Sequence, residues 1–187
     1  FFDTPRAPEE TIFGIPVVAL PDGPEALRRA GVEYLALGQG NNYRRSQDME
    51  HLAGWELELP ALVHPTAYVG HEVQIGVGTV VLPGAILNVS VRVGRGCLIN
   101  SGAILEHGTA VGDFSQISPG ASVASDVHIG SYAFVGIGAS VRGNVRIGDR
   151  TVVGGGAMVV GDLEPGILAT GVPARKVRVL EPGWSPV

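Results

Sequence analysis

The sequence predicts a mainly β protein, in which a parallel β-helix is preceded by a small α/β domain. Three observations support this prediction. Val, Ile or Leu occupies every sixth position from Val63 to Val159. The 187 residues include 28 glycines, where average usage near 7% predicts roughly 13, and only 6% aromatic residues, a composition that suits short strands joined by tight turns. Within the first sixty residues, strand-like and helix-like segments alternate instead.

The six-residue repeat continues without an insertion through 17 consecutive positions. We interpret each repeat as a short strand followed by a corner. Three repeats then close one triangular coil of 18 residues, with the aliphatic side chain inside the prism and parallel pairing between coils. Glycine often follows the aliphatic residue directly, as at Gly76 and Gly94, and we expect it to supply the backbone conformation of a tight corner. The repeating positions are Val63, Val69, Ile75, Val81, Leu87, Val93, Ile99, Leu105, Val111, Ile117, Val123, Ile129, Val135, Val141, Ile147, Val153 and Val159.

The alternating segments at the start of the chain predict an α/β unit with a parallel sheet. Residues 15–20 and 33–38 are predicted strands, and residues 24–30 and 42–53 are predicted helices. The segment Gly38-Gln39-Gly40 lacks the third glycine of a dinucleotide-binding loop, so we interpret it as a turn from strand to helix.

The patterns divide the chain into three parts. We expect an α/β domain over residues 1–60, a hexapeptide-repeat β-helix over residues 61–162 and a C-terminal tail over residues 163–187, because the repeat breaks at Pro165.

Composition and charge exclude several classes of protein. A net charge of −5 without a dense Lys/Arg run argues against nucleic-acid binding, and the apolar stretches are too short to span a membrane. The single cysteine, Cys97, cannot form an internal disulfide or a thiolate zinc site. No signal peptide is visible, so we expect a cytoplasmic protein.

The chain resembles the bacterial hexapeptide-repeat acyltransferases, in particular the family of sialic acid O-acetyltransferases and UDP-4-amino-sugar N-acetyltransferases. The matching segments are residues 1–3, residues 35–38 with Asn41-Asn42, residues 100–114 and residues 171–175. The resemblance implies a left-handed prism, acetyl-CoA as acyl donor, and a homotrimer with each active site between neighbouring subunits. Family members begin with a further strand and a Gly-rich turn that help hold the nucleotide, so we expect the nucleotide-sugar-binding α/β domain to be N-terminally incomplete here.

The same resemblance identifies His107 and Glu106 as catalytic residues. His107 follows the inward position Leu105, so its ring is expected to face outward from a corner. Imidazole titrates near neutral pH and can take a proton from an attacking amine or hydroxyl group. Glu106 would then orient the ring and stabilise the imidazolium. The alternative interpretation of His107 is a solvated corner histidine.

A zinc site is not expected. His71 and His107 lie 36 residues apart, which places them on one edge of the prism. Gamma-class carbonic anhydrases use the same prism, with a third histidine where this chain has Gly112, so the ligand set is incomplete.

The coenzyme site implied by the resemblance involves five residues. The backbone N–H of Ser125 corresponds to the donor for the thioester carbonyl, at a position where a related enzyme has glycine. Backbone groups of Ile137 and Gly155 correspond to contacts with the coenzyme A arm, although ordinary repeat packing is an alternative for both. Arg175 and Lys176 are expected to meet its phosphates.

Three residues are expected to contact the substrate, namely Asp3, Asn100 and Gln116. Some N-acetyltransferases of this family have a second histidine at the position of Gln116, and glutamine can bind a sugar but cannot act as a base near neutral pH. Asn is also common in turns, where its side chain hydrogen-bonds the nearby backbone, so a structural role at the corner is an alternative for Asn100.

The expected function is transfer of an acetyl group from acetyl-CoA to the amine of a nucleotide-linked amino sugar, by direct attack and without an acyl-enzyme. Two alternatives stay open: O-acetylation of a sialic acid, and a non-catalytic β-helix used for assembly.

Overall fold

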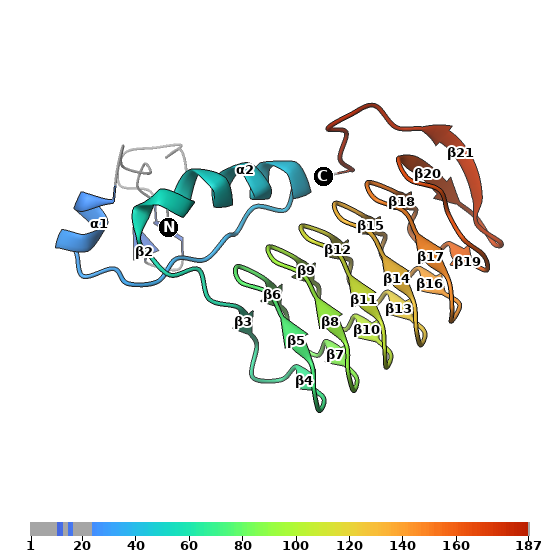
Figure 1. The fold of residues 1–187 in the computed structure, drawn as a ribbon, viewed down its shortest axis with the longest axis horizontal. Coiled ribbons are helices and arrows are strands. Elements are labelled where there is room, and N and C mark those ends of the chain that lie inside the picture. Colours follow the sequence, from blue (N-terminus) through green and yellow to red (C-terminus); the bar gives the residue numbers. More distant parts are fainter. Residues whose placement is uncertain (1–10, 13–14, 17–23, 187) are drawn as a thin grey trace.

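A computed structural model describes residues 11–12, 15–16 and 24–186 of the chain. Asp3 and most of the predicted strand 15–20 lie outside these residues. The chain forms a prism of stacked coils from β3 to β19, with an N-terminal helical unit over the side near its first coils and the strands β20 and β21 at its far end (Figure 1). The prediction of a mainly β protein built on a parallel β-helix is confirmed.

Three parallel sheets form the flat sides of the prism, and we name each after its first strand. The β3 sheet contains β3 Leu62–Val63, β6 Val80–Val81, β9 Leu98–Ile99, β12 Gln116–Ile117, β15 Phe134–Val135, β18 Val152–Val153, β20 Ile167–Thr170 and the antiparallel β21 Arg175–Val179. The β4 sheet contains β4 Tyr68–Val69, β7 Ile86–Leu87, β10 Ile104–Leu105, β13 Ser122–Val123, β16 Ser140–Val141 and β19 Met158–Val159. The β5 sheet contains β5 Gln74–Ile75, β8 Arg92–Val93, β11 Ala110–Val111, β14 His128–Ile129 and β17 Arg146–Ile147.

The register confirms the coil of 18 residues. Val63 pairs with Val81, and Val81 pairs with Ile99. In the two-residue strands β3 to β19 the second residue points inward, and from Val81 to Val159 these side chains are at most 4% exposed. Burial of one such side chain stabilises the fold by roughly 1.5–3 kcal/mol, so the repeating aliphatic positions form the continuous core.

Corners between the sheets form three edges. Edge I follows the β3 sheet and includes residues 100–103, edge II follows the β4 sheet and includes residues 106–109, and edge III follows the β5 sheet and includes residues 112–115. At each corner the third residue after the inward aliphatic has a positive φ, from Glu72 through to Gly156.

The expected role of the glycines that directly follow the aliphatic residues was wrong. Gly76 and Gly94 do not have a positive φ. A Cβ at Gly76 would instead lie 2.5 Å from the backbone nitrogen of Arg95 on the next coil. These glycines are therefore required by the close approach of successive coils, and the positive-φ position is a different one in the repeat.

The N-terminal unit contains α1 Glu25–Arg29, α2 Asn42–Leu52 and a single 3-10 turn over Ala53–Trp55. Its described sheet differs from the prediction, because β1 Thr11–Ile12 and β2 Ile15–Pro16 are antiparallel. Residues 33–38 form no strand, and Tyr34 makes only an isolated parallel bridge to Glu58. The alternating aliphatic residues there pack against the small cluster beneath α2.

Helix α2 packs along edge III, and Arg45 anchors it. The Arg45 side chain is 1% exposed, and its guanidinium donates to the carbonyl oxygens of Gly96 at 2.6 Å and Phe114 at 3.2 Å, on two successive coils. Burial lowers the pKa of Arg45, since desolvation disfavours the charged form. The Tyr43 ring stacks on Tyr132 with centroids 5.1 Å apart.

Two further observations bear on the predictions. None of the helices in the described part of the chain is long and apolar enough to cross a membrane. Cys97 is buried inside edge III, where its amide donates to the Thr79 hydroxyl at 2.9 Å, and burial raises the pKa of its thiol to about 12.

Candidate active site

His107 lies on edge II, directly after strand β10. Leu105 is fully buried and the His107 side chain is exposed, so the ring faces outward as expected. The Nδ1 atom of His107 lies 3.2 Å from the hydroxyl oxygen of Ser125, which occupies the same corner position one coil later. The backbone supports this arrangement, because the Asp126 N–H donates to the His107 carbonyl at 3.0 Å.

Glu106 is half-buried beside His107, with its carbonyl accepting from the Thr109 N–H at 3.3 Å. Within the described ranges, no ion pair of 4.0 Å or less joins the Glu106 carboxylate to the His107 ring. The two side chains are adjacent in sequence but form no ion pair, so the role of Glu106 stays a prediction.

The backbone N–H and carbonyl of Ser125 differ in their hydrogen bonding. The N–H donates to no acceptor among the residues that the structure describes, whereas the Ser125 carbonyl accepts from the Asn144 N–H at 3.0 Å. Gly143 lies over it on the next coil, where a Cβ would be 3.8 Å from the Ser125 nitrogen. An unpaired N–H close to an imidazole has the chemistry of an oxyanion donor.

Ile137 and Gly155 repeat this backbone arrangement on edge I. The Ile137 side chain is 66% exposed, and its carbonyl accepts from the Gly156 N–H at 2.8 Å. A Cβ at Gly155 would lie 3.2 Å from the Ile137 carbonyl oxygen. A glycine at position 155 therefore leaves the backbone of both coils accessible from outside.

Two of the three predicted substrate residues, Asn100 and Gln116, lie on edge I and on the β3 sheet respectively, and Asp3 is outside the described residues. The Asn100 side chain accepts a hydrogen bond from the Ser101 N–H at 3.1 Å, as expected for an asparagine that stabilises a turn. Gln116 projects from the outer side of β12 yet is only 6% exposed, and its amide oxygen is buried without a hydrogen-bond partner in the described chain. A buried oxygen that lacks a hydrogen-bond partner costs about 1–3 kcal/mol.

Arg175 and Lys176 lie in β21, beyond the last coil. Both are exposed, and Lys176 forms an ion pair with Glu164. Such an exposed pair is worth little, so the ammonium group can exchange its partner for a phosphate.

The predicted site residues do not meet within one subunit. His107 and Ser125 lie on edge II, whereas Asn100, Ile137 and Gly155 lie on edge I. The β3 sheet that carries Gln116 is bounded by edges III and I, and it is the side of the triangular prism opposite edge II. One prism therefore cannot bring Gln116 to the His107 ring.

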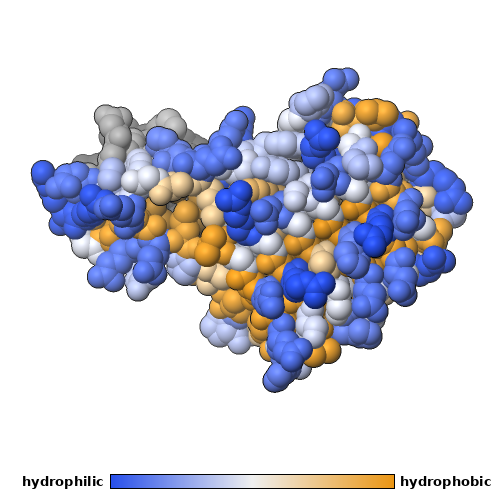
Figure 2. Space-filling view, viewed as in Figure 1, coloured by the Kyte–Doolittle hydropathy of each residue, from blue (hydrophilic) through white to orange (hydrophobic). Residues whose placement is uncertain are grey.

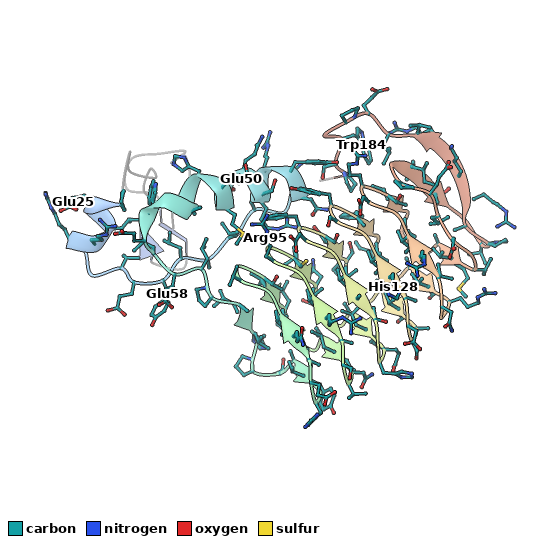
Figure 3. The ribbon with its side chains drawn as sticks, in the orientation of Figure 1. Glu25, Glu50, Glu58, Arg95, His128 and Trp184 are labelled. Carbon is teal, nitrogen blue, oxygen red and sulfur yellow. The ribbon has the colours of Figure 1, made fainter. Side chains whose placement is uncertain are left out.

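Sequence reasoning missed a cavity of about 460 Å³ between α2 and edge III. Figure 3 shows Arg95 below α2, with Glu50 on the helix and Glu58 on the segment that leads to β3. Arg95 forms an ion pair with Asp113 at 3.1 Å and lies over the Phe114 ring at 5.3 Å. The remaining wall is mainly apolar, comprising Met49, Ala53, Leu59, Pro60, Val77 and Phe114. These residues come from separate segments, and no spacing in the sequence links them.

No group of three or more His, Cys, Asp or Glu side chains in the described chain could hold a metal ion. His71 pairs with Glu72, at 3.9 Å between Nδ1 and a carboxylate oxygen.

Comparison with known proteins places the chain among the hexapeptide acyltransferases. The family described as "Bacterial transferase hexapeptide (six repeats)" matches residues 126–161. PerB from Caulobacter crescentus, solved in complex with CoA and GDP-perosamine, is 34% identical with a TM-score of 0.85, over 88% of this chain and 80% of PerB. The acetyltransferase domain of PglB from Neisseria gonorrhoeae is 29% identical with a TM-score of 0.85, over 95% of this chain and 85% of that one. A search of curated proteins gives no match.

The six-residue repeats of the parallel β-helix, together with the family match and the similarity to PerB, place the chain in the class of hexapeptide-repeat transferases. The chain belongs to the hexapeptide-repeat sugar acyltransferases of the left-handed β-helix class, as its identity to PerB shows. WeeI from Acinetobacter baumannii shares the fold, at 24% identity and a TM-score of 0.82 over 90% of this chain and 81% of WeeI. The family and the left-handed prism inferred from the resemblance are thus confirmed.

Proposed function

We propose that this protein transfers the acetyl group of acetyl-CoA to the amine of a nucleotide-linked amino sugar. The observation that carries the proposal is that an outward imidazole, His107, lies on edge II beside Ser125, whose backbone N–H has no acceptor in the described chain. The substrate class is supported by PerB, which was solved with CoA and GDP-perosamine. A mutant of perosamine N-acetyltransferase from the same organism, 33% identical to this chain, was solved with the same two ligands.

In the proposed mechanism, His107 is the general base. The substrate amine attacks the thioester carbonyl carbon while Nε2 of His107 takes the proton that the amine loses. The carbonyl oxygen becomes an oxyanion and accepts a hydrogen bond from the Ser125 N–H. The tetrahedral intermediate then expels the coenzyme A sulfur, which leaves as the thiol by taking up the proton that His107 holds, and the imidazole returns to its neutral form. The amide product and free coenzyme A form without an acetylated enzyme.

The remaining predicted residues are assigned to binding. We propose that the Ile137 and Gly155 backbone contacts the coenzyme arm and that Arg175 and Lys176 meet its phosphates. Asn100, Gln116 and Asp3 are assigned to the sugar nucleotide, which the α/β domain over residues 1–60 helps to hold. Glu106 is proposed to stabilise the imidazolium by its charge across solvent, since the two side chains form no ion pair.

We also propose a homotrimer, in which edge II of one subunit faces the β3 sheet and edge I of its neighbour. This arrangement would bring together site residues that one prism keeps apart. The outer positions of the β3 and β4 sheets support it, since Leu62 is 40% exposed and Tyr68 58% exposed. The β5 sheet instead presents Arg92, His128 and Arg146 outward, and Figure 2 shows hydrophilic and hydrophobic residues interspersed on the face in view. Light scattering should give about three times the 19.4 kDa chain mass; a monomer would contradict the proposal.

The function is tested by release of coenzyme A thiol from acetyl-CoA with GDP- and UDP-linked amino sugars, with the corresponding hydroxy sugars and a free sialic acid as controls. We expect release, and an acetamido product by mass spectrometry, only with the amino sugars. Acetylation of sialic acid alone would favour the O-acetyltransferase alternative. Because acetyl-CoA is the donor, we propose a cytoplasmic location.

A further inference from the structure

The Ser125 hydroxyl is the hydrogen-bonding neighbour of the His107 ring. Its oxygen lies 3.2 Å from Nδ1, while the adjacent carboxylate of Glu106 makes no ion pair with the ring in the described chain. Both Cα positions are fixed by backbone hydrogen bonds between coils, from the Asp126 N–H to the His107 carbonyl at 3.0 Å and from the Asn144 N–H to the Ser125 carbonyl at 3.0 Å. The side-chain contact therefore spans two corners that the fold already holds in register.

We propose that Ser125, through its hydroxyl, is a positioning residue that fixes the tautomer of His107. This inference rests on the proposed function and adds a second role to a residue whose backbone N–H is the oxyanion donor. A neutral imidazole has one N–H and one lone pair. When the Ser125 oxygen accepts the Nδ1–H, the lone pair is on Nε2, the nitrogen that projects farther from the prism. That nitrogen is then ready to accept the proton of the attacking amine.

The test must also distinguish a second reaction that the same two side chains could perform, in which Ser125 is the nucleophile. A hydroxyl within hydrogen-bond reach of an imidazole is also the arrangement of a serine nucleophile with its base. In that case Ser125 would lose its proton to Nδ1 and form an acetyl ester, with coenzyme A thiol as the leaving group. The positioning role needs no acetylated intermediate, so the two mechanisms predict different covalent states of Ser125.

Ser125→Ala removes the hydroxyl and keeps the backbone N–H. We expect kcat to fall about tenfold, as for loss of one orienting hydrogen bond, with KM for acetyl-CoA unchanged. Ser125→Thr restores a hydroxyl and should recover most of the activity. The matched control is Ser131→Ala, at the equivalent corner position six residues later, where the serine carbonyl accepts from the Arg150 N–H at 2.8 Å. It should leave kcat unchanged.

Three results would overturn the inference: wild-type kcat in Ser125→Ala, a raised KM for acetyl-CoA with unchanged kcat, or an acetylated Ser125 peptide after rapid quenching. Nitrogen NMR of the free protein separates this inference from the proposed function, because it needs no turnover. We expect neutral His107 with the proton on Nδ1 in the wild type and a shift toward the Nε2–H form in Ser125→Ala. The same tautomer in both proteins would overturn the positioning role even if acetyl transfer is confirmed.

Discussion

Edges II and III are built from one backbone repeat, but they differ in what covers them. On edge II the side chains of His107 and Ser125 are accessible, and the positive-φ position next to the histidine is Gly108. On edge III the equivalent positions are Phe114 and Tyr132, whose large side chains pack with α2. The backbone sets where each corner residue stands, whereas the side chains decide whether an edge meets a ligand or another segment of the chain.

The comparison also separates activity from stability. Edge II contributes reactive groups that pack against little, so their removal should cost turnover and leave the fold intact. Edge III is covered by α2, whose buried Arg45 donates hydrogen bonds to the carbonyl oxygens of Gly96 and Phe114 and so joins the helix to two coils. Substitution there should destabilise the protein before it affects acetyl transfer.

Loss of His107 should have the largest effect on activity. A general base contributes typically about 10²- to 10⁴-fold, so we expect His107→Ala to lower kcat by at least two decades in the thiol-release assay. Coenzyme affinity, measured by calorimetry, and the midpoint of thermal unfolding should not change. A large loss of coenzyme binding would mean that His107 is a structural residue and that edge II resembles edge III.

Loss of Arg45 should have the largest effect on stability. Arg45→Met keeps the length of the side chain but leaves buried carbonyl oxygens without donors, so we expect the free energy of unfolding to fall by about 3 kcal/mol. The exposed neighbour Arg44 on the same helix supplies the matched control, Arg44→Met, which should change stability little. Urea titration followed by Trp fluorescence reports on both variants. Equal stability of the two would contradict the anchoring role of Arg45.

The two kinds of glycine should respond differently to a methyl group. Gly76→Ala places a Cβ 2.5 Å from the backbone of the next coil, and we expect a loss of about 2–3 kcal/mol because backbone must move. Gly102→Ala meets no atom within 4 Å but retains a φ of +65°, so only conformational strain of about 1–2 kcal/mol applies. Urea titration of both variants measures the difference. If Gly102→Ala proves the more destabilising, strain at corners outweighs the contact between coils.

The prism could be predicted from the sequence because the same position of each six-residue repeat must point inward, and Val63 to Val159 keep that phase. The N-terminal unit could not. The alternation in residues 33–38 is typical of a strand, but a strand needs a neighbour along its length, and among the described residues only Tyr34 makes a bridge, to Glu58. Arg45 in a polar helix would be expected on the surface, since its acceptors belong to corners 51 and 69 residues away.

The candidate site was predictable in part for the same reason. The exposure of His107 followed from the position of Leu105 in the repeat. The contact between His107 and the Ser125 hydroxyl was also encoded, because the two residues are one 18-residue coil apart and must stack on edge II. The predicted partner of the His107 ring was instead Glu106, the residue adjacent to it in sequence. At His107, the neighbour across the coil contacts the ring and the preceding residue along the chain forms no ion pair with it in the described chain.

Glu106→Gln should therefore have the smallest effect of these substitutions. The carboxylate makes no ion pair with His107 in the described chain, so its charge acts on the imidazolium only across solvent. We expect less than a tenfold fall in kcat, which disappears as salt is raised because ions screen such an interaction. The measurement compares kcat of wild type and variant at about 0.01 M and 1 M ionic strength, where screening lengths are about 30 Å and 3 Å. A loss that persists at high salt would mean that Glu106 contacts the His107 ring during turnover. The ring would then be held by Glu106, its neighbour along the chain, as well as by Ser125, its neighbour across the coil.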